Sequence, residues 1–383
     1  SLSPVQQIFA QQVPFQAADA DQIDEVVVTA SPLGLTQEHL AGSINLIDQN
    51  ELERSAASNL GEALAGQLGV TSSSFGPGVG VPIIRGQSGK RVQVLNDGAR
   101  VTDVSDTSAD HAIASEISQV RQVEIIRGPA TLRYGPGAIG GVVNLVERLP
   151  GDEVEQGASG SVSAIYNDNS AAETLDANMR YGVGQFEFSG AVTDRSSGNI
   201  SIPGFADMEA DDADETSDGY IENTDAESRA YGAGLRWQSE AIEWGIELKQ
   251  LDNQYGVPPG AHGHAHGHEH EEEAVEEEAE EFVRIDLEQQ DFQSFLRLDN
   301  PTSFLDSLEI ELAVSEYEHT EIEIEDSIAS LGTFFSKEST EFSVEAVHPL
   351  GNWQSYSGFS LTSDDFVAIG AEAVVTALRV HEA

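Results

Sequence analysis

Beyond residue 150, apolar and polar residues alternate over one segment after another. In residues 242–249, Ile, Trp, Ile and Leu occupy the even positions, and Glu, Gly, Glu and Lys occupy the odd ones. Residues 231–237 and 308–314 repeat the pattern. A period of two is that of a β-strand with one apolar and one polar face. The pattern predicts nine strands, near residues 158–167, 172–182, 185–195, 228–238, 242–251, 282–298, 308–319 and 339–348, and from about 353 onward.

The connections between these segments indicate how the strands are arranged. A soluble sandwich would alternate too. From the second predicted strand on, however, tight turns alternate with longer polar connections, of which the long ones are residues 196–227, 252–281 and 320–338. Transmembrane β-barrels have this arrangement, with short turns on the periplasmic side and long loops outside. We therefore expect antiparallel transmembrane strands with an apolar face toward lipid and a polar face toward a lumen.

Residues 40–150 mix short strands and helices instead. Ser43–Asp48 alternates as a strand, and Asp48 is placed to cap a helix that begins there. A second helix is expected from Ser58 to Gly69. Further strands are expected at residues 83–86 and 92–95, the latter followed by a tight reversal at Asn96-Asp97-Gly98, where positive φ angles are favoured. These elements predict a small α+β domain.

The most ordered stretch runs from Val123 to Val146 and reads VEIIRGPATLRYGPGAIGGVVNLV. Two β-prone runs enclose two Gly-Pro corners, which predicts a strand, a tight turn, a short link and a second strand. Gly140-Gly141 lies before the second strand, where the absence of side chains allows two backbones to approach closely.

This stretch resembles the end of the plug domain of TonB-dependent outer-membrane receptors, in which R-G-P-x-x-x-x-Y-G-x-x-A-x-G-G-V-[VI]-N precedes the barrel. Earlier blocks are similar as well, except that Gln67-Leu68-Gly69-Val70 replaces a Pro-Gly-Val form. The resemblance implies a plug domain at residues 40–150 and the N-terminal part of a transmembrane β-barrel at 151–383. That barrel would be incomplete, because the family's barrels have about 22 strands. The resemblance also implies a location in the outer membrane, in contact with its lipid.

The first residues are expected to couple the receptor to its energy source. Residues 1–22 look like a mobile leader, Gln- and Ala-rich without a period. In residues 23–31, a β-prone run follows two acidic residues, and the alternative is an ordinary first strand of the plug. The resemblance identifies it as a TonB box, captured as an added strand by TonB and its inner-membrane energising complex. The expected TonB-binding residues are Asp24, Glu25, Val26, Val27, Val28 and Thr29.

The net charge of the chain favours cations over nucleic acid as partners. The chain has 67 acidic and 18 basic residues, a formal net charge of −49. Nucleic acid is excluded as a partner, because phosphates demand Lys and Arg. A surface of this sign attracts cations, although an acidic proteome would give the same composition. The chain has no cysteine, so thiolate metal sites are impossible.

Histidines supply the first candidate metal ligands. Residues 260–273 alternate small residues with imidazoles, and a glutamate run follows. Neutral imidazole suits Zn²⁺, Ni²⁺ and Cu²⁺, and a flexible tract favours capture over one rigid geometry. The alternative is a solvated low-complexity loop. The candidate ligands are His262, His264, His266, His268 and His270.

Asp110-His111 is the second candidate. A carboxylate beside an imidazole can bind zinc, although such a pair in a loop is more often an exposed polar dipeptide. Receptors devoted to zinc uptake carry Asp-His-Ala in this plug loop and a His-rich outer loop, and both features match here. The resemblance implies that barrel residues complete the site. Glu341 or Glu345 is expected to supply one ligand, and a further histidine is expected from barrel beyond this chain.

The sequence therefore predicts a TonB-dependent receptor that takes up a divalent metal ion, with Zn²⁺ as transported ligand and no prosthetic group. It predicts no enzyme, because it contains no G-x-S-x-G, P-loop or H-E-x-x-H context. The alternatives are a receptor for a siderophore, cobalamin or another metal, and a surface protein that sequesters metal without transport. The tail at residues 371–380 departs from the strand pattern, which suggests a truncation or a frame change.

Overall fold

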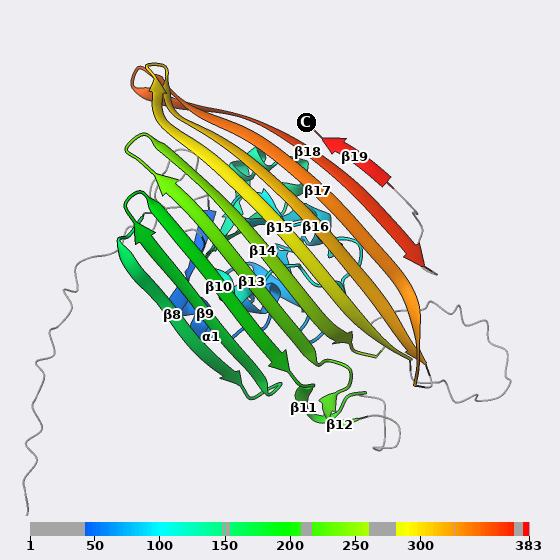
Figure 1. Cartoon of the computed structure of the whole chain (residues 1–383). Helices are drawn as coiled ribbons and strands as arrows, with labels where there is room; N and C mark the ends of the chain where they lie inside the picture. Colours follow the sequence, from blue (N-terminus) through cyan, green and yellow to red (C-terminus); the bar gives the residue numbers. More distant parts are fainter. Residues whose placement is uncertain are drawn as a thin grey trace, which may run out of the picture.

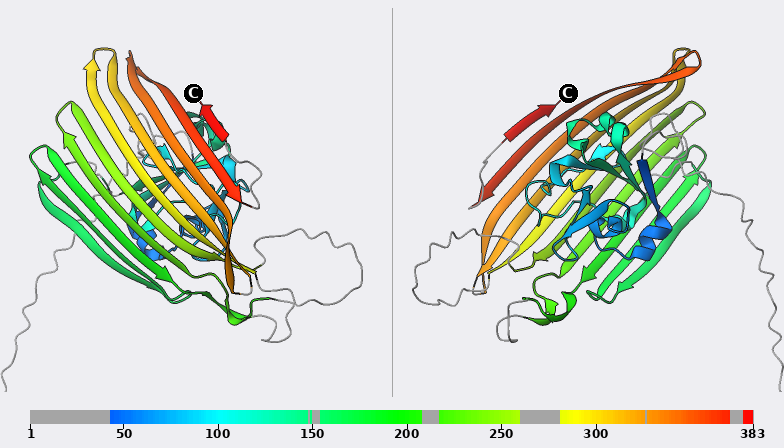
Figure 2. Two further views of the ribbon diagram at one scale, coloured as in Figure 1. Left: turned by 45° about the vertical axis from the view of Figure 1, so that its right-hand side comes forward. Right: turned by 180° about the vertical axis from the view of Figure 1, so that it is seen from behind.

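The structure is a computed structural model that describes residues 43–147, 149, 154–207, 217–259, 281–325, 327–370 and 378–382. The predicted leader, the TonB box and the five histidines of 262–270 lie outside these residues. A small domain rests against the concave side of a large curved sheet (Figures 1 and 2). We call the described part of residues 43–149 the plug, and the large sheet the wall.

The plug is built on a five-stranded sheet in the order β1-β6-β7-β4-β5. All pairs are antiparallel except β4 with β7. The strand predicted at residues 92–95 is confirmed. The tight reversal predicted after it is confirmed too, since Asp97 and Gly98 both have positive φ angles, 48° and 93°. The strands are β1 Ser43–Asp48, β4 Val92–Asn96, β5 Ala99–Arg100, β6 Val120–Arg127 and β7 Gly141–Glu147.

Helices and a hairpin cover this sheet. The Asp48 side chain accepts a hydrogen bond from the Glu51 amide, so the predicted N-cap is confirmed. The second helix is shorter than predicted and begins later, because Asn59 caps it. No helix in the described ranges is long and apolar enough to cross a membrane. The elements are α1 Gln49–Ser55, α2 Leu60–Leu64, the hairpin of β2 Val70–Ser74 and β3 Gly80–Ile84, and the 3-10 helices η2 Gly89–Arg91, η3 Ile117–Gln119, η4 Gly128–Tyr134 and η5 Pro136–Ala138.

The glycine corner packs the plug tightly. The Gly140 amide donates a 2.7 Å hydrogen bond to the Arg91 carbonyl. A Cβ at Gly140 would lie 2.8 Å from that same oxygen, which no side chain tolerates. The predicted close approach of two backbones is therefore confirmed. Beneath it lies the plug core, in which Ile47, Leu64, Ile84, Val123 and Leu145 are at most 1% exposed. Burial of each such side chain contributes about 1.5–3 kcal/mol.

The wall is a ten-stranded antiparallel sheet in which strands follow one another in sequence, from β8 at one edge to β19 at the other. All nine predicted strands are present, and β19 pairs with β18 as a tenth. The strands are β8 Gly157–Asn167, β9 Ala172–Val183, β10 Phe186–Ser197, β13 Ala226–Gln238, β14 Ile242–Val257, β15 Glu281–Thr302, β16 Leu305–Glu325, β17 Ile328–Leu350, β18 Trp353–Gly370 and β19 Leu378–Glu382.

Two predicted connections are wrong. The long loop expected at 320–338 does not exist, because β16 continues to Glu325 and β17 begins at Ile328. The medium loop after residue 298 is also absent, since β15 reaches Thr302 and β16 starts at Leu305. The remaining long connection before β13 contains a small hairpin, β11 Ile200–Phe205 with β12 Asp218–Ile221.

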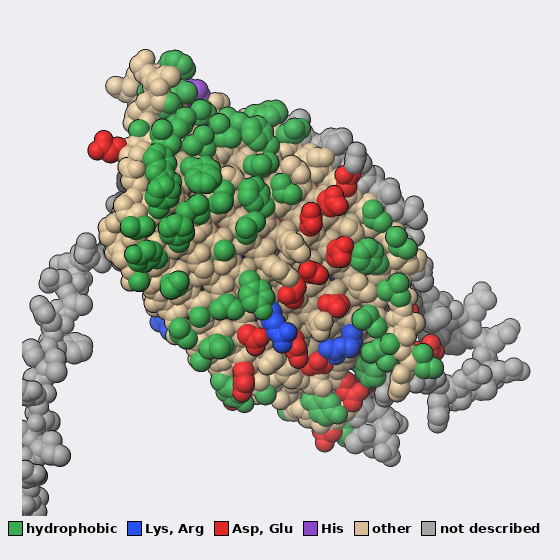
Figure 3. Space-filling model, viewed as in Figure 1, with side chains coloured by type: hydrophobic (Ala, Val, Ile, Leu, Met, Phe, Trp, Pro, Cys, Tyr) green, Lys and Arg blue, Asp and Glu red, His purple; other side chains and the backbone are tan. Residues whose placement is uncertain are grey.

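The two faces of the wall differ as predicted. On β14, Leu248 points outward and is 56% exposed, whereas Glu247 points toward the plug and is 4% exposed. Seen from outside, apolar side chains cover the part of the wall near the short turns, and acidic side chains appear toward the other end (Figure 3). On β16 the change falls between Val314 and Glu316, after which the exposed outward positions are acidic. The strands thus continue past the lipid-facing zone.

Ion pairs join the wall to the plug. Lys249 Nζ lies 3.0 Å from Glu147 Oε1, with both side chains nearly buried. Arg195 pairs with Glu116 at 3.0 Å, and Arg133 Nε donates to Glu345 Oε1 at 2.8 Å. Burial and the charge of Glu147 raise the pKa of Asp97 to about 7. Asp97 and Glu147 thus lie close together, and Lys249 is the cation beside them.

Replacing this lysine tests how strongly the pairs hold the plug. We expect Lys249→Met to destabilise the docked plug by about 3–5 kcal/mol, because it leaves Glu147 buried without its cation. Denaturant titration of the chain in detergent, followed by protection of the plug from protease, measures the loss. The matched control is Arg229→Met, which removes an exposed pair with Asp194 and should leave the titration unchanged. Equal effects of the two substitutions would contradict the assignment.

Candidate metal centre

The plug contributes one imidazole from the loop that joins β5 to η3. The Thr107 amide and hydroxyl both donate to the Val104 carbonyl, at 2.9 and 2.6 Å, which closes a tight turn. The Ala112 amide donates to the Tyr255 hydroxyl of the wall at 2.9 Å. These contacts hold His111 against the wall, where it is 3% exposed. The loop therefore lies against the face of the wall that meets the plug.

The wall contributes its side chains from β16. Tyr317, His319 and Glu321 are separated by two residues each, so all three point to the same face of the strand. This face meets the plug, and the three residues are 1%, 0% and 5% exposed. The local sequence is compatible with a strand because every second residue can remain in solvent, as Glu318 does.

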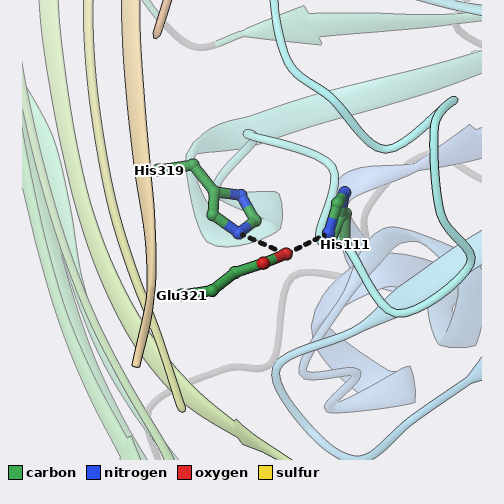
Figure 4. A group of neighbouring side chains, drawn as sticks. All are labelled: His111, His319 and Glu321. Atoms are coloured by element: carbon green, nitrogen blue, oxygen red, sulfur yellow. Dashed lines mark hydrogen bonds and ion pairs between the residues drawn. The ribbon is translucent and has the colours of Figure 1, made fainter. Parts of the chain in front are cut away.

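These residues meet at one point (Figure 4). His111 Nε2 lies 2.9 Å from Glu321 Oε1, and His319 Nε2 lies 3.8 Å from the same oxygen. The two imidazole centroids are 4.6 Å apart. One nitrogen or oxygen atom from each residue lies within 4.8 Å of the others, and no other such group of three or more occurs among the described residues.

The surroundings of the cluster are apolar. The ring of Phe335 lies 5.5 Å from that of His111 and 5.3 Å from that of His319, and Phe366 stacks behind it at 6.2 Å. Burial lowers the pKa of His111, but the hydrogen bond to Glu321 and the charge of Asp110 outweigh it, so that the pKa is raised overall. In the absence of a metal ion, the Glu321 carboxylate therefore favours a charged His111.

The donor set suits a borderline divalent cation. Two imidazole nitrogens and a carboxylate are ligands of Zn²⁺, Cu²⁺ and Ni²⁺, and three protein ligands leave coordination positions open. His319 Nε2 makes no hydrogen bond within the described residues, although it is fully buried. A buried nitrogen with its lone pair toward a carboxylate is stabilised by a cation placed between the two groups.

The predicted ligands fall into three groups. His111 lies in the cluster. Asp110 is buried beside it and accepts a hydrogen bond from Ser108, but it is not part of the group of close donor atoms, so its role as a ligand stays a prediction. The loop histidines 262–270 lie outside the described residues and also stay predictions.

The barrel ligands named from the sequence are different from those the structure brings together. Glu341 accepts a hydrogen bond from the Arg100 amide at 3.2 Å, and Glu345 pairs with Arg133. Both carboxylates face the plug, but neither belongs to the cluster. The further histidine was expected from barrel beyond this chain, whereas the histidine that the structure brings to the cluster, His319, belongs to β16 of the chain itself.

Neither His319 nor Glu321 is a ligand predicted from the sequence, because the predicted strand ends at residue 319 and so does not place the two residues on one face. Glu321 was then assigned to a loop. The signal was present in the spacing, since His-x-Glu places an imidazole and a carboxylate on one face of a strand. It would have required continuing the strand through residues 320–325, where Glu and Ile alternate.

Comparisons with known proteins agree with the fold. Residues 36–142 match the TonB-dependent Receptor Plug Domain family. The chain is 26% identical to the iron-regulated outer membrane virulence protein of Vibrio cholerae serotype O1 over 260 residues, which are 64% of this chain and 37% of that protein. It is 29% identical to the vitamin B12 transporter BtuB of Photobacterium profundum over 149 residues, 38% of this chain and 24% of that protein.

Solved structures share the architecture. The copper transporter OprC superposes with a TM-score of 0.66 at 14% identity, covering 85% of this chain and 46% of that chain. A variant of the ferric enterobactin receptor PfeA from Pseudomonas aeruginosa gives 0.62 at 14% identity, covering 89% and 51%. At this identity the likeness shows the fold alone. The chain spans about half the length of these structures and 37% of the Vibrio relative.

The coarse predictions are therefore confirmed. Residues 36–142 match the plug domain of TonB-dependent receptors, the open antiparallel sheet beside it has the fold of the barrels of such receptors, and the location is the outer membrane. By their names, the similar proteins include a vitamin B12 transporter, a copper transporter and a ferric enterobactin receptor, and none of these names is that of an enzyme. Their names refer to iron, vitamin B12 and copper, so the zinc cargo is not supported by them.

The choice of ligands can be tested directly. In a chain whose five loop histidines are replaced by alanine, we expect His319→Ala to weaken Zn²⁺ binding by about 100-fold or more, since losing a ligand costs at least as much as losing a residue that supports one. Competition with a chelator measures the affinity. His348→Ala is the control, because His348 is an exposed histidine of the same wall. A large effect of Asp110→Ala with none of His319→Ala would restore the ligand pair predicted from sequence.

Proposed function

We propose that the chain is part of a TonB-dependent outer-membrane receptor that takes up a divalent metal ion, with zinc as the favoured cargo. The observation that carries this proposal is the convergence of His111 from the plug with His319 and Glu321 from the wall. A buried pair of imidazoles beside a carboxylate is a poor choice for stability alone, because each polar group loses its hydration. The same arrangement is a good choice for holding a cation.

Because the ligands come from two bodies, movement of the plug would take the site apart. His111 leaves with the plug, whereas His319 and Glu321 stay on the wall. An ion held by three protein ligands would then be held by two, and its affinity would fall. The segment proposed to bind TonB, residues 24–29, precedes β1, which is an edge strand paired only with β6 within the plug sheet. A pull on this segment would reach the plug through an edge strand.

Charge would bring the ion to this site. The chain carries a formal charge of −49, and exposed acidic side chains gather toward the end of the wall that bears the longer connections (Figure 3). Such a field raises the local concentration of cations and their rate of association. In this proposal the loop histidines 262–270 capture ions, and the buried centre selects among them.

The size and chemistry of the centre favour a bare metal ion as cargo. Its donor atoms lie within 4.8 Å of one another and its side chains are almost fully buried, which suits a bare ion better than a bulky chelate. Acidic surroundings also disfavour anionic ferric siderophores. Copper is the strongest rival cargo, since Cu²⁺ accepts the same ligands and outcompetes Zn²⁺ at most nitrogen sites. A sequestering protein without transport is the rival of a different class.

Removing the TonB box separates transport from sequestration. In cells that depend on the receptor, we expect deletion of residues 24–29 to abolish metal accumulation and to leave Zn²⁺ binding by isolated outer membranes unchanged. Deletion of residues 10–15 in the predicted leader is the matched control and should affect neither quantity. Accumulation that survives loss of the box would favour the sequestering protein.

Accumulated metal identifies the cargo. With Zn²⁺, Cu²⁺ and Ni²⁺ supplied together at equal low concentration, elemental analysis of these cells should show an excess of zinc that depends on His111 and His319. The double substitution to alanine should lower zinc and leave the other metals at the level of cells without the receptor. If copper falls instead of zinc, the mechanism stands and the cargo is copper. If no metal depends on the two histidines, the proposed centre is not on the transport route.

A further inference from the structure

A buried tyrosine contacts the metal centre without belonging to its donor set. Tyr317 Oη lies 2.8 Å from Nδ1 of His319, on the side of the ring away from Glu321. Tyr317 is 1% exposed and belongs to the same buried cluster as Val79, Val104 and Tyr255. Water is therefore excluded from this contact, and the hydroxyl is the hydrogen-bond partner of Nδ1 among the described residues.

The contact allows two positions for the proton of His319, because the Tyr317 hydroxyl can accept from Nδ1 or donate to it. If the proton is on Nδ1, it is donated to Tyr317 Oη, and the lone pair of Nε2 faces Glu321. If the proton is on Nε2, the N–H is buried 3.8 Å from Glu321 Oε1, which is too far for a hydrogen bond. An unsatisfied buried donor costs about 1–3 kcal/mol. With the proton on Nδ1, however, the buried Tyr317 hydroxyl is the donor that lacks an acceptor among the described residues, so neither tautomer satisfies every donor in the absence of an ion. A cation at Nε2 needs the lone pair of that nitrogen, and Tyr317 Oη then accepts the proton on Nδ1.

The plug side of the centre repeats this arrangement. His111 Nδ1 lies 3.1 Å from the Val104 carbonyl and 3.1 Å from Thr107 Oγ1. Because the Thr107 hydroxyl donates its own proton to Val104, it can accept one from His111. Both neighbours thus call for a proton on Nδ1, and Nε2 is again the atom directed at Glu321.

The orientation of the two rings is restricted as well. Phe335 packs edge-on against both imidazoles, with interplanar angles of 65° to His111 and 75° to His319. This packing restricts tilting of the rings, and a hydrogen bond at Nδ1 prevents a flip that would exchange the nitrogens. Outer partners of this kind hold metal-binding histidines in place, and their loss typically costs 10–100-fold in affinity.

We propose that Tyr317 is a positioning residue of the metal centre, whose hydroxyl accepts the Nδ1 proton of His319 when Nε2 binds the ion and so holds the ring in its binding orientation. The inference rests on the proposed function, because it requires that His319 bind the metal. It adds that the affinity of the wall for the ion is set by a residue that does not touch the ion.

The test uses the chain with its five loop histidines replaced by alanine, extracted from outer membranes in detergent. We expect Tyr317→Phe to weaken Zn²⁺ binding by about 10–100-fold, measured by competition with a chelator. Co²⁺ is the spectroscopic probe, because its visible absorption reports the number and kind of ligands. The substitution should shift this spectrum toward that of His319→Ala, a change that loss of packing alone does not produce.

Two controls separate the causes. Tyr356→Phe removes a hydroxyl from the same face of the wall, where it bonds to Glu345, and should change neither affinity nor spectrum. His111→Ala tests the proposed function itself. If His111→Ala abolishes tight binding while Tyr317→Phe leaves the affinity and the Co²⁺ spectrum intact, the role of Tyr317 is refuted and the metal centre stands.

If His111→Ala has no effect either, the centre itself is refuted. A third outcome is a Tyr317→Phe chain that binds weakly but keeps the Co²⁺ spectrum of the parent. This result would mean that the tyrosine supports the docking of the plug rather than the orientation of His319, and it would also overturn the proposal. Protection of the plug from protease, measured on the same samples, verifies that each variant is folded.

Discussion

The structure depends on buried polar groups of the wall finding their partners on the plug. The strands of the wall carry polar side chains on the face toward the plug, and a plug that covers this face removes these side chains from water. Glu116 and Glu147 of the plug each pair with a cation of the wall, and Glu345 of the wall pairs with a cation of the plug. Breaking such a pair is costly even where forming it gained little. The pairs therefore fix how the plug sits, and the contact between His111 and Glu321 is one of this set.

Much of this architecture could be predicted from the sequence because it is local. A period of two defines the strands of the wall, and Gly140-Gly141 marks where backbones touch. The missed part lies beyond the lipid-facing zone, at the ends of β15, β16 and β17. There both faces of a strand are solvated or meet the plug, so residues 316–325 carry glutamates on either face. These residues form strands because they pair with neighbouring strands, and not because their apolar and polar residues alternate between two different faces.

Only the plug side of the candidate site could be predicted from the sequence, because the wall side lies in the strand ends that were missed. His111 is visible in a dipeptide, and the family resemblance directs attention to it. Its partner Glu321 is 210 residues away in sequence and reaches it only through the register of the wall and the docking of the plug. Glu341 and Glu345 were reasonable choices by face, but Arg100 and Arg133 occupy them. Which carboxylate is left for a metal is decided by where the plug places its cations.

A site divided between two bodies also links affinity to release. An ion that binds only the docked state stabilises that state by RT ln(1 + [L]/Kd), about 2.7 kcal/mol at a hundred times Kd. That is comparable to breaking one buried ion pair such as Lys249 with Glu147. A tighter centre would capture ions at lower concentration but would resist separation of the plug by the same amount. In the proposed centre, three protein ligands with open positions, held in place by Tyr317 and Val104, would be a compromise in which a pull on the plug could still undo what binding has gained.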